Sequence, residues 1–253
     1  GYVEIDKTAP ALHTYISGWL GSNGWYTSNP TIFVEGFDVH SGVATERVQV
    51  SGLGWQNSGY TISQDGSYSL SYEVTDVAGH TTTGSGSVKV DATDPTLSMS
   101  ITGGGGMNGW HTAPLSVAVS GSDATSGLDK VEMRVNSGTW QAGPVAFGSD
   151  GVYSVAARSV DNAGNLNQAS DTIRVDMTNP TLAESVTGTL GSNGWYVSPV
   201  NVSVSGSDAL SGVDAEQIQV NSGGWGGNTT AITSEGTFNI SFRVIDVAGN
   251  SVS

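Results

Sequence analysis

Aspartates recur at fixed intervals in this chain, and they are the residues best placed to do chemistry. Asp38, Asp123 and Asp208 open the similar stretches DVHSGV, DATSGL and DALSGV, and each lies 85 residues after the one before (123 − 38 and 208 − 123). Two further sets recur with the same step: Asp76, Asp161 and Asp246 in DVAGH, DNAGN and DVAGN, and Asp6, Asp91 and Asp176 in DKTAP, DATDP and DMTNP. Carboxylates gathered in one place repel one another unless a cation neutralises them. Oxygen ligands of this kind suit a hard divalent ion such as calcium.

Two readings of these aspartates stay open. In the first, they are metal ligands, because no lysine or arginine recurs in all three copies to neutralise them. Asp94 joins the candidate ligands, although Asn179 and Ala9 stand at its equivalent positions, and a methyl group cannot coordinate a metal. In the second reading, each aspartate begins a turn and accepts hydrogen bonds from backbone amides two residues on, with no metal.

Tryptophans also recur, and they too have two readings. The motif NGW contains Trp25, Trp110 and Trp195, again 85 residues apart, and Trp19 occurs in the first copy only. Each ring could cover the open end of a small core. The alternative is an exposed ring that stacks on a sugar or a partner surface, and we assign this role to Trp19, Trp25, Trp110 and Trp195.

The elements that position these residues form an internal triplication, because every motif repeats with the same step and without insertion or deletion. Apolar residues alternate with period two, most clearly over residues 68–74 and again over 238–244. Turn-forming residues arrive about every ten positions, and helical periodicity is absent. Six or seven short strands in 85 residues predict a β-sandwich.

The recurring D-x-T-x-P, NGW, D-x-x-SG and D-x-AG-N motifs resemble tandem bacterial immunoglobulin-like repeats, and the resemblance covers essentially the whole chain. It implies modules of bacterial surface proteins, adhesins or the stalks of secreted glycosidases. In an immunoglobulin-like sandwich the B–C and F–G loops lie at the N-terminal pole, beside the linker. The resemblance therefore implies that the aspartates of each repeat converge there. The stretch DATDP is also similar to the calcium-binding linker of cadherins.

We expect three tandem immunoglobulin-like sandwiches that form an elongated rod. The boundaries follow the repeat: residues 6–90, 91–175 and 176–253, with residues 1–5 a stray terminal strand. The third repeat stops before its last strand, whereas the leading residues GYVEID match that strand in sequence. Either the sequence is a window cut from a longer array, or the leading strand of one chain completes the third domain of another.

Composition excludes several functions. The 253 residues carry a net charge of −15, which disfavours binding to nucleic acids and to anionic membranes. There is no cysteine, no apolar run long enough to cross a membrane and no signal-peptide pattern, and the chain begins with Gly, which suggests a mature or excised piece. The four histidines occupy unmatched positions, and no serine lies in a nucleophile elbow. We expect a protein without catalytic activity, located at the cell surface or outside the cell.

The sequence thus predicts an extracellular spacer, stalk or filament subunit, with calcium stiffening its interdomain junctions. Its partners would be further copies of the same repeat, in cis or in trans. The alternative is an adhesin module that binds glycans or a surface through its loop tryptophans.

Overall fold

A computed structural model describes all residues from Gly1 to Ser253. The chain forms two compact units, and each is described by itself. The first comprises Gly1–Ser98, Ser120–Glu132 and Ala157–Ala169, and the second comprises Met99–Val119, Met133–Ala156 and Ser170–Ser253. The middle repeat is therefore divided between the two units. Its B–C and F–G loops lie in residues 120–132 and 157–169, which belong to the first unit.

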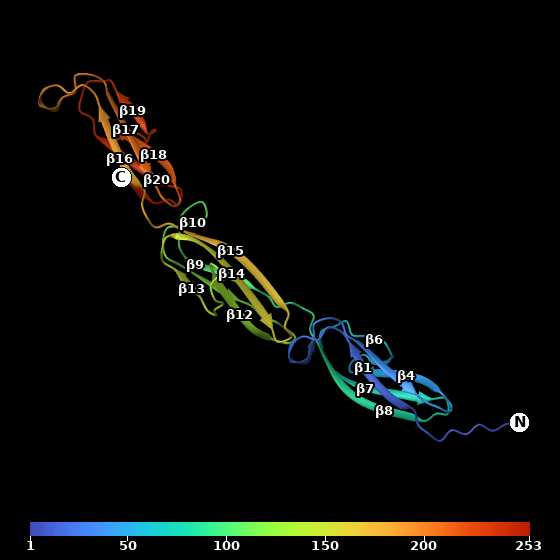
Figure 1. Ribbon diagram of the computed structural model, residues 1–253. Coiled ribbons are helices and arrows are strands. Elements are labelled where there is room, and N and C mark those ends of the chain that lie inside the picture. Colours follow the sequence, from blue (N-terminus) through green and yellow to red (C-terminus); the bar gives the residue numbers. More distant parts are fainter. The chain divides into compact units, whose positions relative to one another are not determined.

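The first repeat folds into two sheets that pack face to face (Figure 1). Its smaller sheet has the order β1-β3-β6, and its larger sheet has the order β2-β8-β7-β4-β5, with β2 running parallel to β8. The strands are β1 (Ala11–Ser17), β2 (Trp25–Tyr26), β3 (Thr31–Phe37), β4 (Val43–Val50), β5 (Gly54–Asn57), β6 (Tyr60–Thr61), β7 (Gly66–Asp76) and β8 (Thr81–Val90).

Alternating apolar side chains from both sheets form the core of this sandwich. Ile32 and Val34 of β3 meet Val48 of β4 and Val74 of β7, and all four are fully buried. Side chains of a strand point to opposite faces in turn, so every second residue enters the core. The alternation in the sequence thus places the polar residues between them on the outer faces.

The third repeat has the same arrangement but fewer strands. Its sheets are β16-β17-β19 and β18-β20-β21, and the core contains Val202, Val204, Ile218 and Val244. The strands are β16 (Thr181–Thr187), β17 (Val200–Ser207), β18 (Val213–Val220), β19 (Thr229–Ile232), β20 (Ile240–Asp246) and β21 (Ser251–Val252).

The middle repeat supplies the two remaining sheets, β13-β11-β9 and β10-β15-β14-β12. Its strands are β9 (Ser98–Gly103), β10 (Trp110–His111), β11 (Leu115–Ser120), β12 (Leu128–Val135), β13 (Val145–Phe147), β14 (Gly151–Asp161) and β15 (Leu166–Val175). The chain is therefore all-β, with three consecutive immunoglobulin-like sandwiches, as the sequence predicts.

The third sandwich differs from the first at its F and G strands. In the first, β8 pairs with β7 from Gly66 to Thr75, whereas β21 pairs with β20 only through Val252 and Ser251. The two strands β7 and β14 begin at Gly66 and Gly151, but β20 begins four residues later in the repeat, at Ile240. The backbone N–H and C=O groups of a strand edge without a neighbouring strand have no partner in the sheet.

A tyrosine corner forms in two repeats, at the start of β7 and of β14. The hydroxyl of Tyr68 donates to the carbonyl of Gln64 at 3.0 Å, and that of Tyr153 donates to the carbonyl of Ser149 at 2.9 Å. Phe238 stands at this position in the third repeat and has no hydroxyl to donate. None of the helices in the structure is long and apolar enough to cross a membrane.

Candidate metal centres

Three groups of side chains each bring their ligand atoms within 4.8 Å of one another. Two of the groups consist of three aspartates and are related by the 85-residue step; the remaining group has a histidine in place of one aspartate. Their members are Asp91, Asp123 and Asp161; Asp176, Asp208 and Asp246; and Asp6, Asp76 and His80.

The strand topology brings the first of these groups together. Asp91 follows the last residue of β8, Asp123 lies just after β11, and Asp161 is the last residue of β14. Asp91 is fully buried and Asp161 is 2% exposed, whereas Asp123 is half-buried. Carboxylates at this depth are costly to ionise without a compensating charge or hydrogen bonds.

Backbone amides supply part of that compensation. One oxygen of Asp161 accepts hydrogen bonds from the amides of Gly164 and Asn165 at 2.7 and 2.9 Å. The other accepts the side-chain amide of Asn165 at 2.8 Å, and this amide also donates to the carbonyl of Asp91 at 2.9 Å. The last residue of the D-x-AG-N motif thus ties the F–G turn to the linker.

The other two aspartates also hold turns. The Oδ2 atom of Asp91 accepts the amide of Ser126 at 2.9 Å. The Oδ1 atom of Asp123 accepts the amides of Thr125 and Gly127 at 3.1 and 2.8 Å, while its Oδ2 atom accepts no hydrogen bond. The aspartates therefore both hold turns and lie close together, and the Oδ2 atom of Asp123 remains available to a metal ion.

The group of Asp176, Asp208 and Asp246 repeats this network. Asn250 donates to Asp246 Oδ2 at 2.8 Å and to the carbonyl of Asp176 at 2.9 Å, as Asn165 does one repeat earlier. Burial raises the pKa of Asp208, but backbone hydrogen bonds from Gly212 and its neighbours outweigh that effect and leave the pKa below its usual range. Asp208 therefore stays ionised at neutral pH, as a metal ligand must.

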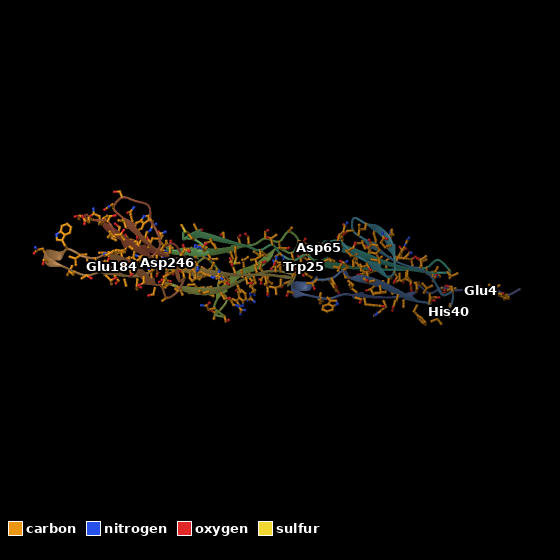
Figure 2. All side chains as sticks on the ribbon, turned by 90° about the horizontal axis from the view of Figure 1, so that it is seen from above. Glu4, Trp25, His40, Asp65, Glu184 and Asp246 are labelled. Atoms are coloured by element: carbon orange, nitrogen blue, oxygen red, sulfur yellow. The ribbon has the colours of Figure 1, made fainter.

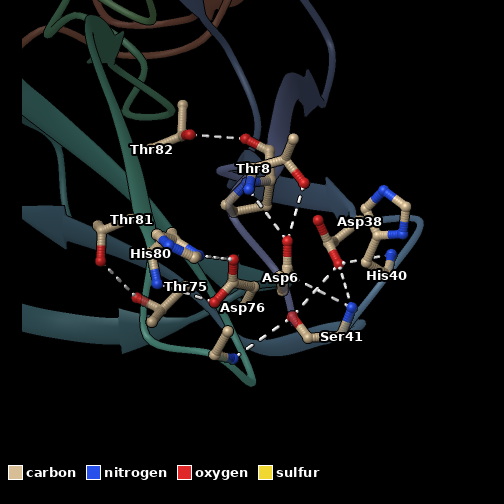
Figure 3. A network of polar contacts seen from close by, with 12 residues as sticks. Asp6, Thr8, Asp38, His40, Ser41, Thr75, Asp76, His80, Thr81 and Thr82 are labelled. Atoms are coloured by element: carbon tan, nitrogen blue, oxygen red, sulfur yellow. Dashed lines mark hydrogen bonds and ion pairs between the residues drawn. The ribbon is translucent and has the colours of Figure 1, made fainter. Parts of the chain in front are cut away.

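The first repeat holds a different group, shown in Figure 3. Asp6 lies between the turn of Asp38 and the turn of Asp76, and the amide of Ser41 donates both to Asp6 Oδ2 at 3.2 Å and to Asp38 Oδ1 at 2.8 Å. Nδ1 of His80 lies 2.9 Å from Asp76 Oδ2. Asp38 lies outside the group of ligand atoms within 4.8 Å, and His80 takes that place.

Hydrogen bonds also set the ionisation of Asp6. The side chain of Ser41 and the backbone of Thr8 hold the pKa of Asp6 well below its usual range, against the smaller, opposite effect of burial. Asp94, the remaining candidate ligand, is exposed and belongs to none of the three groups. Asn179 and Ala9 occupy the equivalent positions in the other repeats, which agrees with the place of Asp94 outside the groups.

Three of the eight lysine and arginine side chains pair with carboxylates outside the aspartate groups. Arg47 pairs with Glu73, Arg158 pairs with Glu132, and Lys130 lies beside Asp129. The imidazole of His80 is the one basic group that contacts an aspartate of a cluster. The two all-aspartate groups thus keep an uncompensated negative charge that a divalent cation would neutralise.

The NGW motif has a role that the sequence reasoning missed, because its asparagine side chain forms a hydrogen bond with the following repeat. The Nδ2 atom of Asn23 donates to the carbonyl of Asn162 at 2.9 Å, and the amide of Ser22 donates to the carbonyl of Ala163 at 2.7 Å. The Nδ2 atom of Asn108 donates to the carbonyl of Val247, also at 2.9 Å. The available signal was the left-handed backbone of Asn before Gly, which presents the side chain at the tip of a turn.

The tryptophans fall into two classes. Trp25 and Trp110 are half-buried, and the Nζ atom of Lys89 lies 5.5 Å from the centre of the Trp25 ring. Trp19 and Trp195 are 80% and 60% exposed. Figure 2 shows Trp25 among the side chains of the first repeat. Of the four candidate stacking residues, Trp19 and Trp195 therefore have rings that are open to a ligand.

No family model matches the sequence, and no curated protein matches it significantly. Among solved structures, the chain is similar to a 1.5-MDa bacterial ice-binding adhesin at 17% identity, covering 98% of this chain and 96% of that one, with a TM-score of 0.33. A calcium-stabilised adhesin of an Antarctic bacterium that binds ice has 16% identity, 98% and 73% coverage and a TM-score of 0.32. Fibronectin(III)-like modules of CbhA from Clostridium thermocellum have 13% identity, 64% and 93% coverage and a TM-score of 0.33. We therefore base the proposals below on the geometry of this chain.

Proposed function

We propose that this chain is a non-catalytic structural module of a bacterial surface or secreted protein, a spacer, stalk or filament subunit whose repeat junctions bind calcium. The structural units would be the three repeats, at residues 6–90, 91–175 and 176–253. The observation that carries the proposal is the group of Asp91, Asp123 and Asp161, which come from a linker and two loops and meet within 4.8 Å.

Calcium fits this donor set better than other cations. It takes about six to eight oxygen ligands, including carboxylates and backbone carbonyls, at flexible distances. Both all-aspartate groups offer carboxylate oxygens only, without the nitrogen or sulfur ligands that zinc prefers. A bound ion would join the linker residue, Asp91 or Asp176, to two loops of the repeat that it opens, and so would limit motion at the junction. The group with His80 is a poorer calcium site, because calcium prefers oxygen ligands and imidazole nitrogen suits transition metals better.

Thermal unfolding with calcium and with chelator tests the proposal. Calcium is expected to raise the melting temperature of the natural chain, and Asp123→Ala is expected to remove most of the shift that its own junction contributes. Asp129→Ala serves as the matched control, because Asp129 is exposed and lies outside all three groups. Identical melting curves with calcium and with chelator would remove the ion from the proposal.

The second candidate is an adhesin module that binds glycans or a surface, and the exposed rings of Trp19 and Trp195 favour it. Aromatic rings of this kind stack on sugar faces or on a partner. Quenching of tryptophan fluorescence by a polysaccharide, lost in Trp19→Ala, would support binding over a purely mechanical role. Unchanged fluorescence across a panel of polysaccharides would leave the spacer as the better account.

A further inference from the structure

The F–G turn of the first repeat has a histidine where the other two repeats have asparagine. His80 stands at the position that Asn165 and Asn250 occupy in the 85-residue repeat. In the second repeat the side-chain amide of Asn165 forms a bridge, because it donates to Asp161 Oδ2 at 2.8 Å and to the carbonyl of Asp91 at 2.9 Å. This amide therefore connects the F–G turn directly to the linker residue.

The imidazole of His80 makes only half of that bridge. Its Nδ1 atom lies 2.9 Å from Asp76 Oδ2, but neither ring nitrogen bonds to the carbonyl of Asp6, the linker residue of this repeat. The side chain of Asp76 is fully buried, and the imidazole is the one partner of its Oδ2 atom. The second ring nitrogen of His80 therefore has no partner in the protein, and His80 does not connect its turn to Asp6.

We propose that Asp6, Asp76 and His80 bind a zinc ion, which joins the linker to the F–G turn as Asn165 does in the second repeat. The three side chains bring ligand atoms within 4.8 Å of one another, and Figure 3 shows Asp76 between His80 and Asp6. Zinc bonds of about 2.0–2.2 Å to nitrogen and oxygen place tetrahedral ligand atoms about 3.3–3.5 Å apart. Small movements of these side chains would therefore complete the site.

The donor set selects the class of ion. Imidazole nitrogen suits zinc and other late transition metals, whereas calcium takes about six to eight oxygen ligands. Asp38 lies outside this group, although its equivalents Asp123 and Asp208 belong to the other two groups. Compared with those groups, the first group has gained a nitrogen ligand and lost a carboxylate. Both changes favour zinc over calcium.

The local backbone directs two of the ligands toward one ion. Asp76 and His80 lie at the two ends of one tight turn, in which the amide of Asp76 donates to the carbonyl of His80 at 3.0 Å. The amide of His80 donates to Asp76 Oδ1 at 2.8 Å, which leaves Oδ2 and the imidazole to face each other. Two ligands on a turn that is already formed lose little conformational freedom when the ion binds.

The third ligand is in the charge state that zinc requires. Metal ligands must be deprotonated. Hydrogen bonds from Ser41 and Thr8 hold the pKa of Asp6 well below its usual range, so its carboxylate is ionised at neutral pH. Three protein ligands leave one tetrahedral position to water. This inference goes beyond the proposed function and does not depend on calcium at the two all-aspartate groups.

Isothermal titration calorimetry with zinc, on the 253-residue chain in excess calcium, is the experiment. The natural chain is expected to bind one zinc ion. The variant His80→Asn should bind it at least about 100-fold more weakly, because loss of a hydrogen-bond partner of a ligand alone costs about 10- to 100-fold. Asparagine is the residue of the other two repeats at this position, so the fold should tolerate the change. His40→Asn is the matched control, because His40 is exposed and lies outside the group.

NMR spectroscopy of the imidazole rings identifies the ligand. Zinc should shift the resonances of His80 and leave those of the other three histidines in place. A natural chain that binds no zinc, binding that calcium abolishes, binding that survives His80→Asn, or shifts confined to other histidines would each overturn the proposal. Calcium-dependent melting is measured separately, so failure of the zinc site and failure of the proposed function are distinguishable.

Discussion

At the scale of single residues, aspartates have two tasks in this protein. Asp161 shows them most clearly: it holds its own turn through the amides of Gly164 and Asn165, and it also lies within 4.8 Å of two carboxylates from other loops. The sequence predicts each task separately, because the turn motif and the recurrence are both visible. It could not predict that one side chain performs both, since the choice of oxygen depends on three-dimensional geometry.

Asp6 gives a pH prediction at this scale. Hydrogen bonds, first among them that of the Ser41 side chain, depress its pKa when folded. A depressed pKa contributes stability above the unfolded value of about 3.9, and this contribution is lost as pH falls through the folded value. The melting temperature of the natural chain should therefore fall as pH drops below about 4.

The variant Asp6→Asn isolates that contribution, because an amide does not titrate. Its melting temperature should lie below that of the natural chain at neutral pH, and the two curves should converge toward pH 2. Calorimetry between pH 2 and 7 makes the comparison. A constant gap between the curves over the whole range would show that ionised Asp6 adds no stability.

At the scale of elements, an arginine lies over the recurring tryptophan in both the first and the third repeat, but it comes from a different strand in each. In the first repeat Arg47 of β4 pairs with Glu73 of β7, and its guanidinium lies 4.5 Å from the centre of the Trp55 ring. In the third repeat the arginine is on the other strand: Arg243 of β20 bonds Gln217 and lies 4.4 Å from the centre of the Trp225 ring. The contact between an arginine and this tryptophan thus occurs in both repeats, although the arginine occupies different positions. A position-by-position comparison of the repeat sequences does not reveal it.

The turn that contains Asn23 provides a prediction with an internal control. Asn23 and Asn193 have nearly the same left-handed backbone, with φ of 53° and 57°, but only Asn23 reaches a partner, the carbonyl of Asn162. Replacing either with glycine keeps that backbone conformation accessible and removes the amide. Asn23→Gly should therefore speed hydrogen exchange of the Ser22 amide, which bonds Ala163.

Asn193→Gly is the control for that experiment. It should leave exchange at Ser192 close to that of the natural chain. Loss of one hydrogen bond, worth about 0.5–1.5 kcal/mol, corresponds to roughly a two- to tenfold faster exchange at Ser22. Equal effects of the two substitutions would assign the change to the backbone and not to the contact with the following repeat.

At the scale of the whole molecule, the sequence predicts the architecture well because the repeat has three copies. The exact step of 85 residues fixes equivalent positions, and the period-two alternation identifies core residues such as Leu70, Val74 and Val244, which are all buried. The placement of Asp94 outside the cluster and of His80 inside one could not be predicted in this way. Both depend on the direction of a side chain at a loop, which the repeat pattern does not encode.

The three sandwiches are unequal, and this inequality predicts the order in which they unfold. Ile62 and Leu70 are 0% and 2% exposed in the first, whereas their equivalents Ile232 and Ile240 are only half-buried in the third. In addition, Phe238 has no hydroxyl with which to form the tyrosine corner. Several partly exposed apolar side chains, each worth about 1.5–3 kcal/mol when buried, make it the least stable of the three.

Hydrogen exchange at matched positions measures this difference within one molecule. At low protein concentration, the amide of Val204 should exchange at least about tenfold faster than that of its equivalent Val34, although both side chains lie in a core. Equal protection of Val204 and Val34 would mean that the weaker burial of Ile232 and Ile240 costs the third sandwich no stability.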